Sequence, residues 1–223
     1  MRRTKLIDRK LPRYTKGEEI MNMVTHIAGG ALAILAWILC ASKALSTGST
    51  AGLVGSLIYG FTMVALYTVS SIYHGLKPGT GKKVMQVIDH CTIYFLIAGT
   101  YTPILLSAFL PVYPIIGWGL LTAQWVLCFL AATLTAIDLK AYNTFSMFCY
   151  IGMGWSIIFF IPQCIRVLSP TGFYFLLSGG IAYTIGAILY GIGSKKPWIH
   201  SVFHIFVVLG SALQFISIIG FVL

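Results

Sequence analysis

The feature that most constrains this chain is a series of apolar runs, each about 20 residues long or longer, separated by short polar breaks. The hydrocarbon core of a bilayer is about 30 Å thick, and a helix needs about 20 apolar residues to cross it. We therefore predict an all-α fold, a bundle of seven transmembrane helices. The expected spans are Ile20–Ser42, Ala51–Leu76, Val84–Phe109, Tyr113–Ile137, Thr144–Gln163, Thr171–Gly193 and Trp198–Val222.

The composition agrees with a membrane protein. Hydrophobic residues make up 58% of the chain and charged residues only 9%, whereas soluble domains carry about 25% charged residues. Seven spans with short loops use nearly the whole length. We expect residues 1–19 to form a basic cytoplasmic tail and residues 20–223 one transmembrane domain, in a cell membrane that is the bacterial plasma membrane.

The placement of positive charge predicts how the bundle is oriented. Seven of the 15 Lys and Arg residues lie in the first 16 residues. With the N-terminus inside, 13 of the 15 face the cytoplasm, and only Lys43 and Arg166 face the other side. Cytoplasmic loops are rich in Lys and Arg, so we predict the N-terminus inside and the C-terminus outside.

The placement of positive charge also indicates which partners the chain contacts. A basic segment beside a transmembrane helix is typical of contact with anionic lipid headgroups, which we expect for the tail. No basic patch is interleaved with exposed aromatic residues, so we expect no nucleic-acid partner. The sequence leaves the oligomeric state open.

All the histidines are expected at one depth in this orientation. They lie within a few turns of the cytoplasmic ends of four spans: His26, His74, His90, His200 and His204. Asp89 lies at the same level. Ionisable groups inside a bilayer normally face the bundle interior and have partners there, which indicates a polar site in the cytoplasmic third of the bundle.

The spacing of these residues suggests metal chemistry. His200 and His204 are four residues apart in one span, so both imidazoles can reach one ion. Ser70 and His74 repeat this spacing in another span. A third histidine and a water would complete an open, tetrahedral zinc site. Asp89 is suited to hold and deprotonate that water.

Each of these residues also has a purely structural explanation. His200 and His204 could form a hydrogen-bonded pair in the core, and His74 could be a satisfied histidine at a helix end. Asp89 could be an acid in the first turn of a helix, stabilised by the helix dipole. Ser70 could bond back to its own helix. We interpret His26 and Asn22 as packing and interhelical hydrogen bonding. Taken together, the common depth of the histidines, Asp89 and Ser70 favours a zinc site over these separate structural explanations.

Four segments carry a resemblance to a known family: EIMNMVTH at 19–26, SSIYH at 70–74, DHCTIYFLIAGTYTP at 89–103 and KPWIHSVFHIFVVLGSALQF at 196–215. The chain resembles the hemolysin III family, the bacterial branch of the progestin and adipoQ receptors, which include the adiponectin receptors. The resemblance implies seven helices with the N-terminus inside and zinc on His74, His200 and His204. Asp89 and Ser70 match the family's aspartate and serine near the metal.

The resemblance also suggests what the protein does. The wider superfamily includes alkaline ceramidases, which implies a zinc-dependent hydrolase of lipid amides or esters, with a membrane lipid as substrate or ligand. Two alternatives remain: a receptor with structural zinc, and a cytolysin, as the family name implies. A pore would favour a polar stripe across the whole bilayer. Gln214 departs from the histidine often expected at that position.

Overall fold

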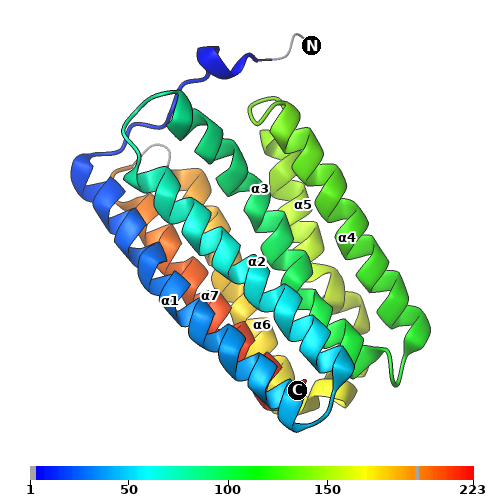
Figure 1. Cartoon of the computed structure of the whole chain (residues 1–223). Coiled ribbons are helices and arrows are strands. Elements are labelled where there is room, and N and C mark those ends of the chain that lie inside the picture. Colours follow the sequence, from blue (N-terminus) through cyan, green and yellow to red (C-terminus); the bar gives the residue numbers. More distant parts are fainter. Residues whose placement is uncertain (1–3, 194–195) are drawn as a thin grey trace.

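The computed structural model describes residues 4–193 and 196–223, and within these ranges every regular element is helical. The helices run back and forth along one bundle, and the N- and C-terminal ends lie at opposite ends of it (Figure 1). The elements are η1 (Leu6–Asp8), α1 (Lys16–Ser46), α2 (Thr50–Gly75), α3 (Thr80–Pro103), η2 (Ile104–Phe109), α4 (Pro114–Ile137), α5 (Asn143–Trp155), η3 (Ser156–Phe160), α6 (Ile161–Gly193) and α7 (Ile199–Phe221).

Six helical segments of the described chain are long and apolar enough to cross a membrane. The sequence predicted seven, and the difference lies in Asn143–Gly193, which counts here as one segment of 51 residues. Within it, Ser169 has φ 61° and ψ 164°, which is not helical, and Pro170 follows. This break falls in the predicted loop. Length and hydropathy alone therefore do not confirm the count of seven, nor do they establish which end is cytoplasmic.

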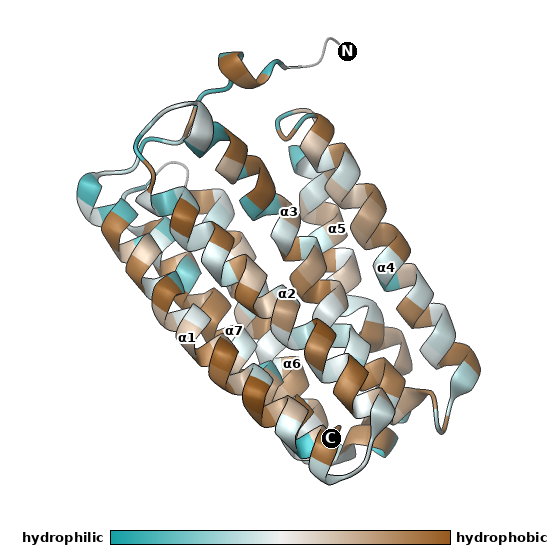
Figure 2. Cartoon of the chain, in the orientation of Figure 1, coloured by the Kyte–Doolittle hydropathy of each residue, from teal (hydrophilic) through white to brown (hydrophobic). Residues whose placement is uncertain are grey.

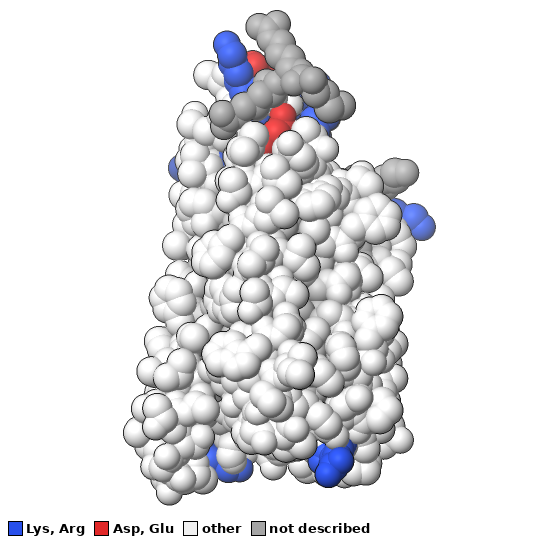
Figure 3. All heavy atoms as spheres, turned by 90° about the vertical axis from the view of Figure 1, so that its right-hand side faces the viewer, with Lys and Arg blue, Asp and Glu red and all other residues white. Residues whose placement is uncertain are grey.

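The outside of the bundle is apolar. Large hydrophobic side chains such as Phe61, Phe148 and Phe159 are 64%, 74% and 82% exposed, and apolar residues recur along the outer helices (Figure 2). On the face in Figure 3, Lys, Arg, Asp and Glu gather at the two ends and leave a charge-free belt between them. Such a surface suits lipid and not water, so the chain is a membrane protein.

Small residues let the helices approach closely. A Cβ added at Gly60 would lie 2.0 Å from the ring of Trp37, and one at Gly99 would lie 2.0 Å from the hydroxyl of Thr62. Close approach through small residues is how membrane helices associate. α1 packs against both α2 and α7, and this packing brings together the helices that carry the predicted histidines.

Candidate metal centre

Three histidines converge at the end of the bundle where α1 begins. His74 comes from α2, while His200 and His204 come from successive turns of α7. All three are buried, and one ligand nitrogen from each lies within 4.8 Å of the others. The Nε2 atoms of His200 and His204 are 3.1 Å apart. Nitrogens bound to one tetrahedral zinc are about 3.3 Å apart, so the cluster could hold a metal ion after a small approach by His74.

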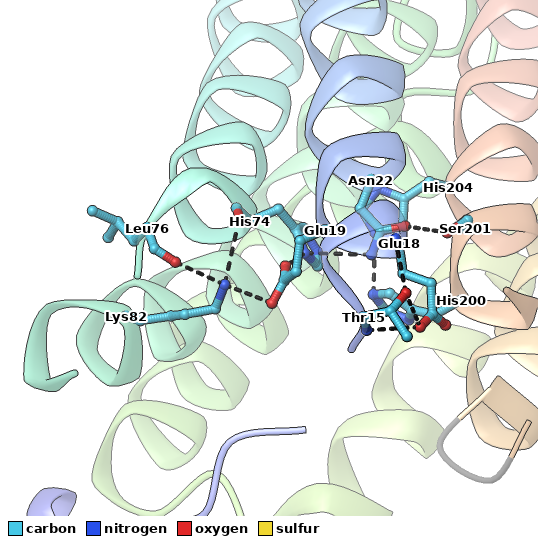
Figure 4. A network of polar contacts seen from close by, with 10 residues as sticks. All are labelled: Thr15, Glu18, Glu19, Asn22, His74, Leu76, Lys82, His200, Ser201 and His204. Carbon is cyan, nitrogen blue, oxygen red and sulfur yellow. Dashed lines mark hydrogen bonds and ion pairs between the residues drawn. The ribbon is translucent and has the colours of Figure 1, made fainter. Parts of the chain in front are cut away.

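The hydrogen bonds of His74 indicate which nitrogen faces the cluster. Its Nδ1 lies 2.7 Å from a carboxylate oxygen of Glu19 and 3.4 Å from the side-chain amide nitrogen of Asn22 (Figure 4). The shorter contact is to a charged acceptor and dominates, so Nδ1 carries the proton. The Nε2 of His74 is buried without a hydrogen-bond partner among the described residues. A metal ion would satisfy this nitrogen.

Glu19 is held in turn by a buried lysine. Lys82 Nζ donates to the other carboxylate oxygen of Glu19 at 2.7 Å and to the carbonyl of Leu76 at 3.0 Å. Lys82 is only 3% exposed. From the sequence, Lys82 is one of the Lys and Arg residues expected in the cytoplasmic loops, and no role is predicted for Glu19. Two signals pointed to Glu19: it lies at the depth of the histidines, and it is the first residue of the motif at 19–26.

α1 contributes none of the three clustered histidines, but it connects the two helices that do. Glu18 accepts a hydrogen bond from the main-chain N–H of Trp198 at 2.7 Å, directly before α7. Asn22 accepts from Ser201 of α7 at 2.6 Å. Glu19 meanwhile reaches His74 of α2. Three side chains near the start of α1 thus set the spacing between α2 and α7.

Asp89 and Ser70 lie beside the cluster. Ser70 of α2 lies close enough to Asp89 of α3 for its hydroxyl to interact with the carboxyl group. Both residues line a cavity whose wall also includes His200 and His204. The structure thus brings the five predicted site residues to one end of the bundle.

The cavity extends from this polar end into the bundle. It has a volume of about 190 Å³ and is mostly apolar, with Leu176 and Val207 among the lining side chains. Gln214, the departure noted in the sequence, also lines it. Ile151 and Ile158 line it too and are 38% and 42% exposed. The arrangement offers a long apolar space that ends at the histidines and the aspartate.

The N-terminal segment covers this end of the bundle. Tyr14 stacks on His200, and the main-chain N–H of Thr4 donates to the carboxylate of Asp138 at 2.7 Å. That hydrogen bond is the main cause of the lowered pKa of Asp138. Arg2 and Arg3 of the predicted basic tail, and Ser194 and Lys195 of the last predicted loop, lie outside the described residues.

The two remaining histidines do not join the cluster. The ring of His26 packs 3.9 Å from that of His204, centroid to centroid. His90 is 2.8 Å from the carbonyl of Gln86 and 2.9 Å from the hydroxyl of Tyr190. Both ring nitrogens of His90 therefore have partners away from the three-histidine cluster.

A helical bundle with an apolar belt and a buried three-histidine cluster defines an integral membrane protein with a candidate metal centre. Residues 14–215 match the family described as haemolysin-III related, and the chain belongs to this family. The resemblance predicted from the four motifs is confirmed.

The matches to individual relatives extend over most of both chains. The chain is 37% identical to Hemolysin-3 of Bacillus cereus over 216 residues, 96% of this chain and 97% of the relative. It is 36% identical to the Hemolysin-3 homolog of Bacillus subtilis (strain 168) over 206 residues, 92% and 95% of the two chains. Human Monocyte to macrophage differentiation factor is 25% identical over 169 residues, 72% of this chain and 67% of that protein.

Proposed function

We propose that this chain is a zinc-dependent membrane hydrolase of lipid amides or esters. The observation that carries the proposal is the buried cluster of His74, His200 and His204, set at the end of an apolar cavity that Asp89 and Ser70 also line. These three histidines would hold the zinc, which supplies Lewis acidity when bound.

The chain's own residues would do the rest of the chemistry. As a general base, Asp89 accepts a proton from the attacking water, and it returns this proton to the leaving amine or alcohol as the acyl C–N or C–O bond breaks. Ser70, which lies close to Asp89, orients the carboxylate or polarises the substrate carbonyl. Tyr14 covers the site from the end of the bundle, which limits access of bulk water.

The cavity supports a lipid as the substrate. Each buried methylene contributes about 0.8 kcal/mol, so an acyl chain in an apolar cavity supplies substantial binding energy. The exposed lining residues Ile151 and Ile158 suggest entry from the bilayer. Ceramide-like amides are the first substrates to test, since they combine an acyl chain with a scissile amide.

We also propose seven crossings, with the N-terminus in the cytoplasm. The two termini lie at opposite ends of the bundle (Figure 1), which supports an odd number of crossings, and the break at Ser169 would supply the extra turn. A cysteine at position 166 should be labelled only from the non-cytoplasmic side. Labelling from the cytoplasm would refute this topology.

The exposed basic side chains of the N-terminal segment support contact with anionic headgroups. They are Lys5, Lys10, Arg13 and Lys16. Attraction of this kind contributes about 1 kcal/mol per Lys or Arg near the surface. We propose membrane lipid, and no nucleic acid, as the partner of this segment.

A cytolysin is the second candidate, because two relatives are named Hemolysin-3 or its homolog. The histidines and Asp89 gather at one end of the bundle instead of forming a polar path across it, which favours the hydrolase. A receptor with structural zinc predicts that removing zinc unfolds the protein and that no lipid is turned over.

One experiment separates these possibilities. The purified chain is analysed for zinc and screened against lipid amides and esters, with Asp89→Asn as the matched control. The asparagine is isosteric but a poor base, so the variant should keep its zinc and lose about 10²- to 10⁴-fold in rate. Equal rates for the two proteins would exclude Asp89 as the base. No turnover by either would support the receptor or the cytolysin.

A further inference from the structure

Glu19, His74 and Lys82 form a chain of short contacts (Figure 4). It begins at the three-histidine cluster with His74 and ends at the buried ammonium group of Lys82. Both bonds made by the Glu19 carboxylate, to His74 Nδ1 and to Lys82 Nζ, are 2.7 Å long. The two partners approach different oxygens of the same carboxylate. Glu19 is therefore fixed from both sides and has little freedom to turn.

This geometry selects one tautomer of His74. An ionised carboxylate only accepts hydrogen bonds, so the imidazole must present N–H at Nδ1. The lone pair is then on Nε2, the buried atom that has no hydrogen-bond partner among the described residues. The opposite tautomer would direct a proton at His200 and His204 and would prevent His74 from binding a metal through Nε2.

Lys82 holds the carboxylate of Glu19, and it also holds the main chain at His74. Its ammonium group donates to the carbonyls of His74 and Leu76 at 3.4 and 3.0 Å, at the C-terminal end of α2. A cation at this end of a helix satisfies carbonyls that have no partner within the helix. One buried lysine thus holds the main chain of His74 directly and the side chain of His74 through Glu19.

We propose that Glu19, held by Lys82, is a positioning residue that sets the tautomer and direction of His74 and thereby the metal affinity of the three-histidine cluster. The inference rests on the metal site of the proposed function. Carboxylates behind a ligating histidine typically change metal affinity by about 10- to 100-fold when they are removed. The competing explanation is an ion pair that only joins the ends of α1, α2 and α3.

The test measures zinc affinity of the full chain in detergent by competition with a chelator, and thermal stability in parallel. Glu19→Gln should bind zinc about 10- to 100-fold more weakly. The matched control is Asp138→Asn, whose carboxylate accepts hydrogen bonds from the main-chain N–H groups of Thr4, Lys140 and Ala141 and not from a histidine or from α7. Its affinity should stay within about threefold of the wild type, since no ligand loses its partner.

A charge-reversed pair, Glu19→Lys with Lys82→Glu, separates the two explanations. It restores an ion pair but places an ammonium group, which only donates, beside Nδ1 of His74. We expect it to recover thermal stability relative to the single changes without recovering zinc affinity. ¹⁵N NMR of histidine-labelled protein without metal should show His74 protonated at Nδ1 in the wild type and at Nε2 in the reversed pair.

The outcomes distinguish this inference from the proposed function. If the wild type binds zinc and Glu19→Gln binds it equally well, the positioning role is wrong and the metal site stands. The same holds if the reversed pair regains wild-type affinity. If the wild type binds no zinc at all, the proposed function and this inference both fail.

Discussion

Tyr14 and His200 stack nearly parallel, with ring centroids 4.8 Å apart and ring planes inclined by 18°. Tyr14 belongs to the segment before α1, so this contact brings the N-terminal segment directly onto the candidate metal centre. Burial, with smaller contributions from nearby ionisable groups, raises the pKa of Tyr14. The phenol is therefore neutral, and the segment closes the site with an uncharged ring.

We predict that Tyr14→Ala exposes the cluster to water. A chelator should then remove zinc several-fold faster than from the wild type, because the ring no longer covers His200. Tyr14→Phe keeps the stacked ring and is the matched control, with an expected rate close to wild type. The measurement is the rate of zinc transfer to a coloured chelator. Equal rates for Tyr14→Ala and Tyr14→Phe would show that the ring does not limit access.

Removal of a ligand should abolish stoichiometric zinc. We expect one zinc per wild-type chain and none retained by His204→Ala, because two histidines do not complete a tetrahedral site with useful affinity. His90→Ala is the control, since the partners of His90 are Gln86 and Tyr190 and not the cluster. Elemental analysis after dialysis measures both. Retention of zinc by His204→Ala would exclude this residue as a ligand.

The sequence predicted His200 and His204 as a pair from a local signal, and the family resemblance added His74 as the third histidine. The spacing of His200 and His204 follows from helix geometry alone, and the common depth of the histidines follows from hydropathy and charge. The structure brings these residues together with Asp89 and Ser70 at one end of the bundle. The choice of zinc over another metal stays a prediction.

The residues that the sequence did not reveal act through contacts between distant segments. Lys82 stands beside Lys83 after a Pro–Gly pair, which is typical of an exposed loop, yet it is buried against Glu19 and the end of α2. Tyr14 lies in a basic stretch with no periodicity. Neither local pattern indicates that Lys82 contacts Glu19 or that Tyr14 stacks on His200.

The number of membrane crossings does not follow from hydropathy and length alone. Hydropathy is nearly continuous from Asn143 to Gly193, so a measure based on length and composition joins the whole stretch. In the structure, the non-helical backbone conformation of Ser169 marks the break. The sequence placed a loop there from Arg166, Ser169 and Pro170, which are polar or helix-breaking residues in an apolar stretch.

The cavity provides a last prediction, about the substrate. Gly180 of α6 lines the cavity, and a Cβ at this position would meet no atom within 4 Å. Gly180→Leu should therefore fold normally, keep its zinc and fill part of the space proposed for an acyl chain. Gly119→Leu is the matched control: Gly119 of α4 also has open space around it, is exposed, and does not line the cavity.

The expected effect depends on the length of the lipid chain. If the leucine displaces two methylene groups, about 1.6 kcal/mol of binding is lost, or roughly 15-fold in affinity. Short-chain lipids that do not reach Gly180 should bind with unchanged affinity. Binding of a series of acyl amides of increasing length to the zinc-loaded chain measures this difference. An equal loss for all lengths, or the same profile in Gly119→Leu, would show that the acyl chain does not occupy this cavity.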